Sequence, residues 1–296
     1  MAVRFGLGLP IVQQVPMRAQ AWEANAGGPE LVRIAQAADR LGFTHLSASD
    51  HVLVPRSRAD AMGAPWYDAA VTLAFLAGVT QRIRLLSHVI VLPYRHPLLV
   101  AKAFGTLDHL SRGRVILGVG SGHLKPEFRI LGAPYERRGA ISDEYLQAIA
   151  AAWEKEVAEF RGETVSFRDV LVAPRPVQRP RPPIWVGGNS PAVVRRAARY
   201  ADGWIPWQLG PEEFGAAVAR AAKIAGEAGR TTPLDFVAPM TISTTDKTAD
   251  ALQQVRAWRA AGATSFHVGL ANRSLDEFLE RMEWFAGEVM PRCEGT

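Results

Sequence analysis

The 296-residue sequence contains a single cysteine, Cys293, which lies beside the C-terminus. One cysteine excludes an internal disulfide framework and any metal site built from several cysteines. The sequence also has no apolar run of about 18 residues, the length that a transmembrane helix needs. The opening residues MAVRFGLGLP lack the charged region and apolar core of a secretory signal. We therefore expect a cytoplasmic protein with no membrane partner.

Basic residues exceed acidic residues only modestly, at 34 Lys and Arg against 29 Asp and Glu, which gives a net charge of +5. The sequence has no basic run, no RNP-like aromatic pattern and no zinc-finger spacing, so we expect no nucleic-acid partner. An anionic small molecule would suit this charge. With 48% hydrophobic and 21% charged residues, the composition is that of an ordinary soluble globular protein with a sizeable core.

Short apolar strands alternate with amphipathic helices along the whole chain. The expected strands cover 3–9, 44–48, 83–92, 114–119, 184–187, 203–206, 235–243 and 265–269. The expected helices cover 29–41, 68–79, 97–110, 139–153, 190–200, 211–228, 249–261 and 274–289. Eight strand–helix units predict an α/β fold of the (β/α)8 TIM barrel type, and an open doubly wound sheet is the structural alternative.

Two segments interrupt the alternation. Residues 10–28 form a long loop, and residues 157–183 have the pattern of a short hairpin followed by a proline-rich approach to the next strand. Neither has enough apolar periodicity for a core of its own. We expect a single domain over residues 1–296 that carries both segments as insertions.

The stretch RVILGVGSGHLKPEF (114–128) runs from an apolar strand into three glycines. It is no dinucleotide fingerprint, because the third glycine after Gly118 and Gly120 is replaced by His123. It is no hydrolase elbow either, because the glycine two residues before Ser121 is missing. The stretch therefore predicts a glycine-rich strand end of another kind.

The strongest physical signal is the segment WVGGNSP (185–191). Gly187 and Gly188 allow a ligand to approach the backbone, and Asn189 stands just before a helix that begins with proline. The positive end of this helix would suit a phosphate. The alternative is an ordinary tight turn with a good helix cap.

Two histidines follow strand ends, where barrel enzymes carry their active sites. His51 could donate a hydrogen bond to a developing negative charge or could be satisfied by a loop carbonyl. His123 has the same two interpretations, and Glu127 could pair with it. Trp204 and Trp207 could line an aromatic pocket or belong to the core. No histidine–carboxylate set has a recognised metal-ligand spacing, so we expect no metal.

Three blocks of the sequence resemble the bacterial luciferase-like family of flavin- and deazaflavin-dependent oxidoreductases. Residues 89–139 resemble its signature block, residues 174–204 resemble its second block, and SDH at 49–51 matches a third. The resemblance spans nearly the whole chain. It implies a (β/α)8 barrel with a flavin-like ring at the carboxyl ends of the strands.

The resemblance also implies roles for individual residues. Ser87–His88 resembles the family's β-bulge, often a non-proline cis peptide, that supports the ring from behind. His51 matches the histidine near the pyrimidine edge of the ring. The other residues that the resemblance assigns to the cofactor are Asp50, Gly120, Ser121, Gly122, Gly187, Gly188 and Asn189. The glycines of the strand end at 114–128 would then clear space for a flat ring and its polyol tail.

One departure bears on the reaction. The sugar-phosphate dehydrogenase branch of the family has a glutamate where this chain has His123, which makes His123 a candidate proton donor or substrate ligand. The amino-acid sequences of these blocks are closest to the F420-dependent branch. We therefore expect an oxidoreductase that transfers hydride between coenzyme F420 and an organic substrate.

Other functions remain open. One alternative is a reduced-FMN monooxygenase supplied by a separate flavin reductase, and another is a noncatalytic flavin- or deazaflavin-binding protein. An unrelated sugar-phosphate barrel lyase would need an active-site lysine, and none of the five lysines lies in an expected strand. Members of this family are often dimers, so we expect a homodimer.

Overall fold

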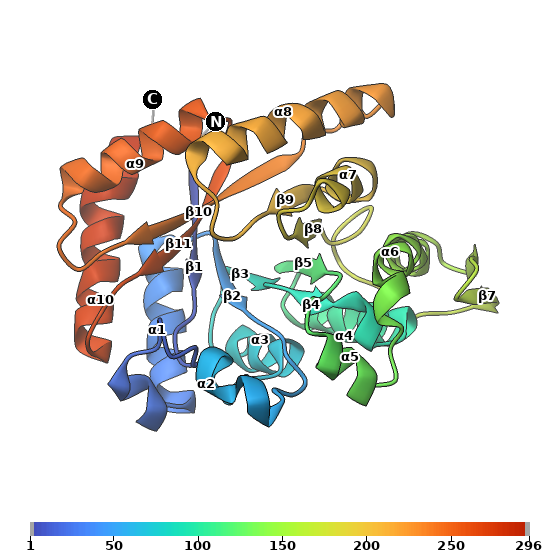
Figure 1. The fold of residues 1–296 in the computed structure, drawn as a ribbon, viewed down its shortest axis with the longest axis horizontal. Helices are drawn as coiled ribbons and strands as arrows, with labels where there is room; N and C mark the ends of the chain where they lie inside the picture. The colour runs from blue at the N-terminus through green and yellow to red at the C-terminus, as the bar shows by residue number, and fades with distance from the viewer. Residues whose placement is uncertain (1–2, 294–296) are drawn as a thin grey trace.

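Eight parallel strands close into a barrel in the computed structural model, which describes residues 3–293 (Figure 1). The strands are β1 (Arg4–Gly8), β2 (His45–Ala48), β3 (Arg84–Ser87), β5 (Val115–Gly120), β8 (Ile184–Gly187), β9 (Gly203–Ile205), β10 (Asp235–Ile242) and β11 (Ser265–Leu270). Closure follows from the pairing of β3 with both β2 and β5, and of β1 with both β2 and β11. The predicted TIM barrel is confirmed.

Helices surround the barrel and join successive strands (Figure 1). The long ones are α1 (Gly28–Leu41), α3 (Ala69–Ala77), α4 (Pro97–Leu110), α6 (Arg138–Glu154), α7 (Pro191–Tyr200), α8 (Pro211–Glu227), α9 (Thr248–Ala260) and α10 (Leu275–Trp284). The last expected helix is interrupted, because α10 ends at Trp284 and passes into a π-helical turn, η5 (Phe285–Val289), and a 3-10 turn, η6 (Met290–Cys293). Within residues 3–293, no helix is both long enough and apolar enough to cross a bilayer.

Both predicted insertions lie outside the alternation of strands and helices. Residues 10–28 contain only one short 3-10 helix, η1 (Ala21–Asn25). Residues 157–183 begin with an antiparallel hairpin of β6 (Ala158–Arg161) and β7 (Ser166–Val170), as the sequence predicted. In Figure 1 this hairpin projects from the edge of the barrel beyond α6.

Short elements build the mouth of the barrel after β2, β3 and β5. They are η2 (Arg56–Arg58), α2 (Ala59–Met62), β4 (Ile90–Val91), η3 (Leu92–Tyr94), α5 (Lys125–Ile130) and η4 (Tyr135–Arg137). The expected strand over 83–92 is therefore two strands, since β3 ends at Ser87 and β4 begins at Ile90. A cis peptide joins His88 to Val89 in the interval.

A separate apolar layer crosses the inside of the barrel. It consists of the fully buried side chains Leu86, Ile116, Trp185, Ile205 and Val237. These residues come from β3, β5, β8, β9 and β10, and each adjoins a residue that packs in the larger core between strands and helices. This alternation follows from the two-residue period of side chains along a strand. The layer separates the two ends of the barrel.

Candidate functional site

The carboxyl ends of the barrel strands gather all the residues that the sequence singled out. Asp50 and His51 follow β2, while Ser87 ends β3. The segment from Gly120 to His123 follows β5, and the segment from Gly187 to Asn189 follows β8. Parallel strands in a closed barrel bring these ends to one mouth, where enzymes of this fold carry their active sites.

His51 is held by a buried carboxylate. Its Nδ1–H donates to Glu127 Oε2 over 2.7 Å, and the Glu127 side chain is completely buried. The prediction that Glu127 pairs with His123 is therefore wrong. Glu127 lies in the first turn of α5 with its side chain directed to the loop after β2, whereas His123 precedes that helix and is exposed.

The Glu127 carboxylate accepts three further hydrogen bonds. They come from the backbone N–H groups of Val52 (2.8 Å) and Leu53 (3.2 Å) and from the hydroxyl of Tyr94 (2.8 Å). Burial alone would raise the pKa of Glu127, but the hydrogen bonds from His51, Tyr94 and Leu53 outweigh it and lower the pKa. An ionised Glu127 thus orients the His51 ring and leaves Nε2 directed away from the carboxylate.

Aromatic rings surround the other edges of His51. Trp66 meets it edge-on with ring centroids 4.5 Å apart, and His123 meets it edge-on at 5.9 Å. His51 and His123 are therefore neighbours at the mouth, although they come from different strand ends. Trp207, after β9, is half exposed, whereas Trp204 is fully buried and stacks on Phe214, so Trp204 belongs to the core.

Asp50 has a partner within the protein. Its buried carboxylate makes two bonds to the Arg95 guanidinium, at 2.6 and 2.8 Å. Arg95 also lies 3.6 Å from the carboxylate of Asp68. This ion pair fixes the loop after β2 against the turn after β4. Direct contact of Asp50 with a cofactor stays a prediction.

The end of β3 is fastened to β5. The Ser87 hydroxyl donates to the Gly118 carbonyl over 2.9 Å and accepts from the Gly118 N–H over 3.0 Å. The non-proline cis bond that the resemblance associates with Ser87–His88 lies one residue later, between His88 and Val89.

The glycines at the strand ends face protein side chains. A Cβ atom on Gly120 would lie 2.7 Å from one methyl of Val89, and a Cβ atom on Gly187 would lie 2.6 Å from the other. A Cβ atom on Gly122 would lie 2.6 Å from Val91. These glycines therefore make room for the chain after β3. The interpretation that they clear space for a ring is corrected, because valine side chains fill the space beside them.

The turn after β8 adjoins the beginning of a helix, and its role as a phosphate site stays a prediction. Gly188 has φ +118°, a conformation that residues with side chains rarely adopt. Ser190 caps α7 by accepting the N–H of Val193, so the positive end of this ten-residue helix lies beside the glycines. The Asn189 amide donates to the Trp207 carbonyl over 2.6 Å and accepts the Trp207 N–H over 3.1 Å. Asn189 thus ties this turn to the loop after β9.

Ser121 is also engaged. Its hydroxyl lies 3.0 Å from Nη1 of Arg196, a buried residue of α7 that also contacts Asp143 of α6. Arg196 therefore couples the end of β5 to the helix that follows the turn after β8. Nothing in the sequence indicates this link, because Arg196 lies in the amphipathic pattern of an ordinary helix.

A column of three histidines lies in the barrel beneath the mouth, with His45 buried and His88 and His267 half-buried. The rings of His88 and His267 meet edge-on at 4.7 Å, and His267 Nδ1 lies 3.4 Å from His45 Nε2. Burial lowers the pKa of His45 to about 3 and that of His88 to about 4, and it lowers the pKa of His267 well below its usual value. Gly6 on β1 makes the space, since a Cβ atom there would lie 1.9 Å from His45.

Comparison with known proteins decides the family. The family profile described as luciferase-like monooxygenase matches residues 3–290. This chain belongs to that family. The luciferase-like chain is 36% identical over 229 residues to an uncharacterized protein of Mycobacterium tuberculosis (strain ATCC 25618 / H37Rv), with 76% of each chain covered.

Two relatives of the luciferase-like chain have named cofactors. It is 32% identical over 187 residues to an F420-dependent glucose-6-phosphate dehydrogenase of Amycolatopsis mediterranei (strain U-32), covering 62% of this chain and 54% of the relative. It is 31% identical over 174 residues to an FMNH(2)-dependent dimethylsulfone monooxygenase of Pseudomonas putida, covering 57% and 46%. The fold matches the coenzyme F420-dependent tetrahydromethanopterin reductase of Methanopyrus kandleri with a TM-score of 0.79, 18% identity, and 99% and 100% of the two chains covered.

Proposed function

We propose that this chain is an F420-dependent oxidoreductase that transfers hydride between the deazaflavin and an organic substrate. The observation that carries the proposal is His51, fixed at the barrel mouth by the fully buried carboxylate of Glu127. An imidazole held in this way can donate a hydrogen bond to negative charge without first reorganising. The charged partner behind it keeps the proton on Nδ1, so exchange of a proton would take place at Nε2.

The residues around His51 suit an anionic flavin-type cofactor. The turn of Gly187, Gly188 and Asn189 at the positive end of α7 would hold its phosphate. When bound, F420 would supply a ring that accepts or donates a hydride. His51 would hold a hydrogen bond to the ring's polar edge. His123, beside it, would contact the substrate or deliver a proton to it.

One observation favours F420 over FMN. The net charge of +5 suits a cofactor with a polyglutamate tail.

The second candidate is a reduced-FMN monooxygenase. The FMNH(2)-dependent relative supports it, and a separate flavin reductase would then be a partner. The cofactor decides the reaction class, because the deazaflavin lacks the nitrogen that stabilises oxygen adducts. A noncatalytic binding protein would bind a cofactor and convert no substrate.

Titration with F420 and FMN, each oxidised and reduced, tests the proposal. We expect F420 to bind at least about tenfold more tightly than FMN, a difference of about 1.4 kcal/mol. Micromolar FMN binding without F420 binding would replace the proposal by the monooxygenase. Tight F420 binding with no turnover across a panel of alcohols, aldehydes and enones would favour the noncatalytic protein.

Gly188→Val tests the phosphate turn in the same titration. Its side chain would meet Val193 and would be strained at φ +118°, so we expect a loss of cofactor affinity of about tenfold or more. The matched control is Gly210→Val, because Gly210 also precedes a helix, has open space around it and has a negative φ. If both variants fold and bind the cofactor with equal affinity, the turn is not part of the cofactor site.

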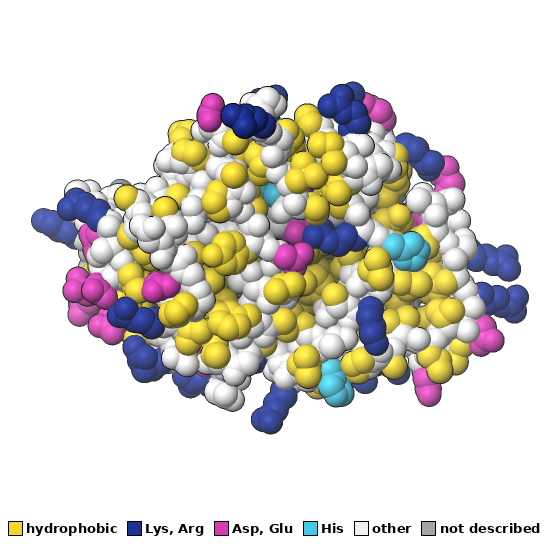
Figure 2. All heavy atoms as spheres, turned by 90° about the horizontal axis from the view of Figure 1, so that it is seen from below, with side chains coloured by type: hydrophobic (Ala, Val, Ile, Leu, Met, Phe, Trp, Pro, Cys, Tyr) yellow, Lys and Arg dark blue, Asp and Glu magenta, His cyan; other side chains and the backbone are white. Residues whose placement is uncertain are grey.

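We also propose a homodimer that buries the exposed apolar side chains of α3 and α4. Val71 and Phe75 of α3 are 70% and 48% exposed, and Leu99 of α4 is 65% exposed. Figure 2 views the molecule from below Figure 1, the side on which α2 to α5 lie, and hydrophobic side chains gather in broad patches there. Contiguous exposed apolar surface of this kind marks association sites.

A further inference from the structure

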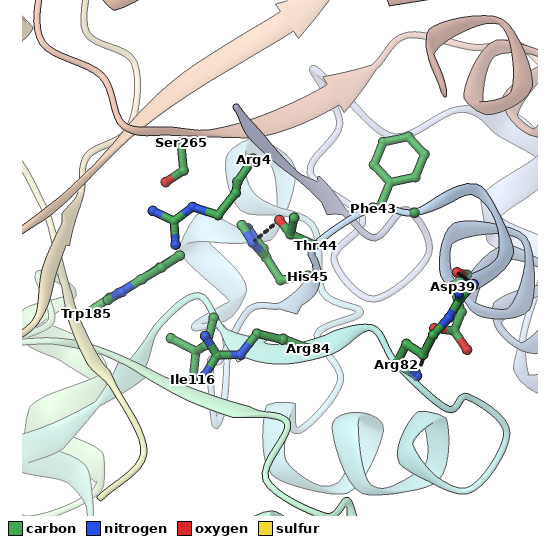
Figure 3. A pocket seen from close by; sticks show the side chains of 11 residues that line it. Arg4, Asp39, Phe43, Thr44, His45, Arg82, Arg84, Ile116, Trp185 and Ser265 are labelled. Atoms are coloured by element: carbon green, nitrogen blue, oxygen red, sulfur yellow. Dashed lines mark hydrogen bonds between the residues drawn. The ribbon is translucent and has the colours of Figure 1, made fainter. Parts of the chain in front are cut away.

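A second cavity opens at the opposite end of the barrel from the candidate site. Its volume is about 360 Å³, and it lies among the first residues of the strands, including Arg4 of β1, Arg84 of β3 and Ser265 of β11 (Figure 3). Ile116 and Trp185 of the apolar layer also line it. This layer and the histidine column therefore separate the cavity from the barrel mouth.

Two buried polar groups on the cavity wall have no hydrogen-bond partner among residues 3–293. They are the indole Nε1 of Trp185, a side chain 2% exposed, and the hydroxyl of Ser265, 1% exposed. In Figure 3 both side chains lie on the same side of the cavity as the guanidinium group of Arg4. The indole N–H can only donate, so it requires an acceptor from outside the chain. Buried polar groups of native proteins almost always have one.

The charge on the wall indicates what that acceptor is. The side-chain hydrogen bonds of Arg84 go to neutral oxygens, those of the Val115 carbonyl and the Gln178 amide, and within residues 3–293 no carboxylate lies within 4.0 Å of its guanidinium. Arg4, beside it, is already paired with Asp235. Arg82, an exposed residue of the wall, donates to the Asp39 carbonyl and has no carboxylate partner within residues 3–293 either. The cavity wall therefore carries Arg84, a cation without a counterion, and two donors that lack acceptors.

The remaining polar groups on the wall do not neutralise this cation. The Asp39 carboxylate accepts the backbone N–H groups of Gln81, Arg82 and Ile83, so its oxygens are engaged. His45 is buried and its pKa of about 3 makes it neutral near pH 7. Water would satisfy the indole and the hydroxyl but would leave the charge of Arg84 unpaired. A small anion with several acceptor oxygens satisfies all three groups.

We propose that this cavity binds a small oxyanion, such as a phosphate, sulfate or carboxylate group, through Arg84, Trp185 and Ser265, with Arg4 beside them. The site is independent of the proposed cofactor, because it lies at the other end of the barrel. Bound anion would tie together the beginnings of β3, β8 and β11, so it would stabilise the folded barrel.

Thermal unfolding with inorganic phosphate, sulfate and acetate tests the proposal, with chloride added to keep the ionic strength constant. We expect the Tm to rise with the logarithm of the concentration of at least one of these anions, and the comparison of the three distinguishes a phosphate-type from a carboxylate-type ligand. A Tm that follows ionic strength alone for all three anions would overturn the proposal and leave water as the occupant.

Three cavity variants and one control test where the anion binds. Arg84→Met should weaken anion binding about tenfold or more, whereas Arg168→Met, which removes an exposed arginine from the distant hairpin, should leave it unchanged. Ser265→Ala removes a donor without a partner, so it should not lower the Tm in anion-free buffer and yet should reduce the anion-dependent rise. Trp185→Phe should reduce this rise as well, although the smaller ring leaves a cavity in the apolar layer that itself lowers the Tm. If the rise survived unchanged in all three cavity variants, the anion would bind elsewhere and the proposal would be wrong.

Discussion

Lowering the pH from about 7 to about 5.5 is expected to reduce the free energy of unfolding by roughly 4 kcal/mol, because three histidines inside the barrel are held in neutral form. His45, His88 and His267 form the column inside the barrel, and burial is the main cause that lowers each pKa. In the unfolded chain each imidazole binds a proton near its ordinary pKa of 6.5. The folded state then binds fewer protons than the unfolded state.

The sign and size follow from this difference. A histidine whose folded pKa is depressed contributes stability that is fully present above pH 6.5 and is lost as the pH falls toward the folded pKa. Each group can change the unfolding free energy by at most about 1.4 kcal/mol per pH unit, which gives about 1.2 kcal/mol per histidine over this interval. Carboxylates with lowered pKa values, such as Asp39 and Glu127, start from 3.8 and 4.5 and lose their contribution at lower pH.

Urea unfolding at the two pH values measures the effect. His267→Gln should reduce the pH-dependent loss of unfolding free energy by about one third, whatever its effect on stability at neutral pH. His109→Gln, which changes an exposed histidine of α4, should leave the loss unchanged. If the wild-type protein lost less than about 1 kcal/mol of unfolding free energy between the two pH values, the imidazoles would be hydrated or already charged in the folded state. The account of a neutral histidine column would then be refuted.

Two further changes test the site and the assembly. Glu127→Gln should lower kcat for hydride transfer about tenfold with a smaller change in KM, because the amide cannot hold His51 with a charged hydrogen bond. Steady-state kinetics measure this, with the exposed Glu136→Gln as the control. An equal loss of kcat in both variants would contradict the prediction. Phe75→Glu should convert the homodimer to a monomer in size-exclusion chromatography with light scattering, while Leu171→Glu, at another exposed apolar residue, should not. A wild-type protein that is already monomeric would end the dimer proposal.

The sequence was sufficient to predict the barrel because the fold repeats one simple pattern. Each strand is short and apolar and each helix is amphipathic, so the period of hydrophobic residues locates both. The hairpin over 158–170 was also predictable, since Ala158 and Phe160 of β6 alternate with the exposed Glu159 and Arg161 outside the repeat. The break at 284 was not, because the buried residues Met282, Phe285 and Val289 recur at the three- and four-residue spacing of a regular helix.

The polar contacts of the site were beyond what the sequence could predict. His51 and Glu127 are 76 residues apart, and nothing in their spacing distinguishes this pair from His123 with Glu127. The histidine column has the same difficulty, because His45 of β2 and His267 of β11 meet over β1, which lies between their strands. A weak signal existed in β1, where Gly6 and Gly8 occupy alternate positions and leave space for large side chains opposite.

The glycines at the strand ends show how a resemblance can identify residues without explaining them. Gly120 and Gly187 lie at the strand ends that the resemblance assigns to the cofactor, yet both face the methyl groups of Val89. Any larger residue at either position would displace Val89, and with it the chain between β3 and β4. That chain continues into β4, which pairs with the end of β5. The glycines would therefore act on a bound cofactor through the position of this segment, which they fix between β5 and β8.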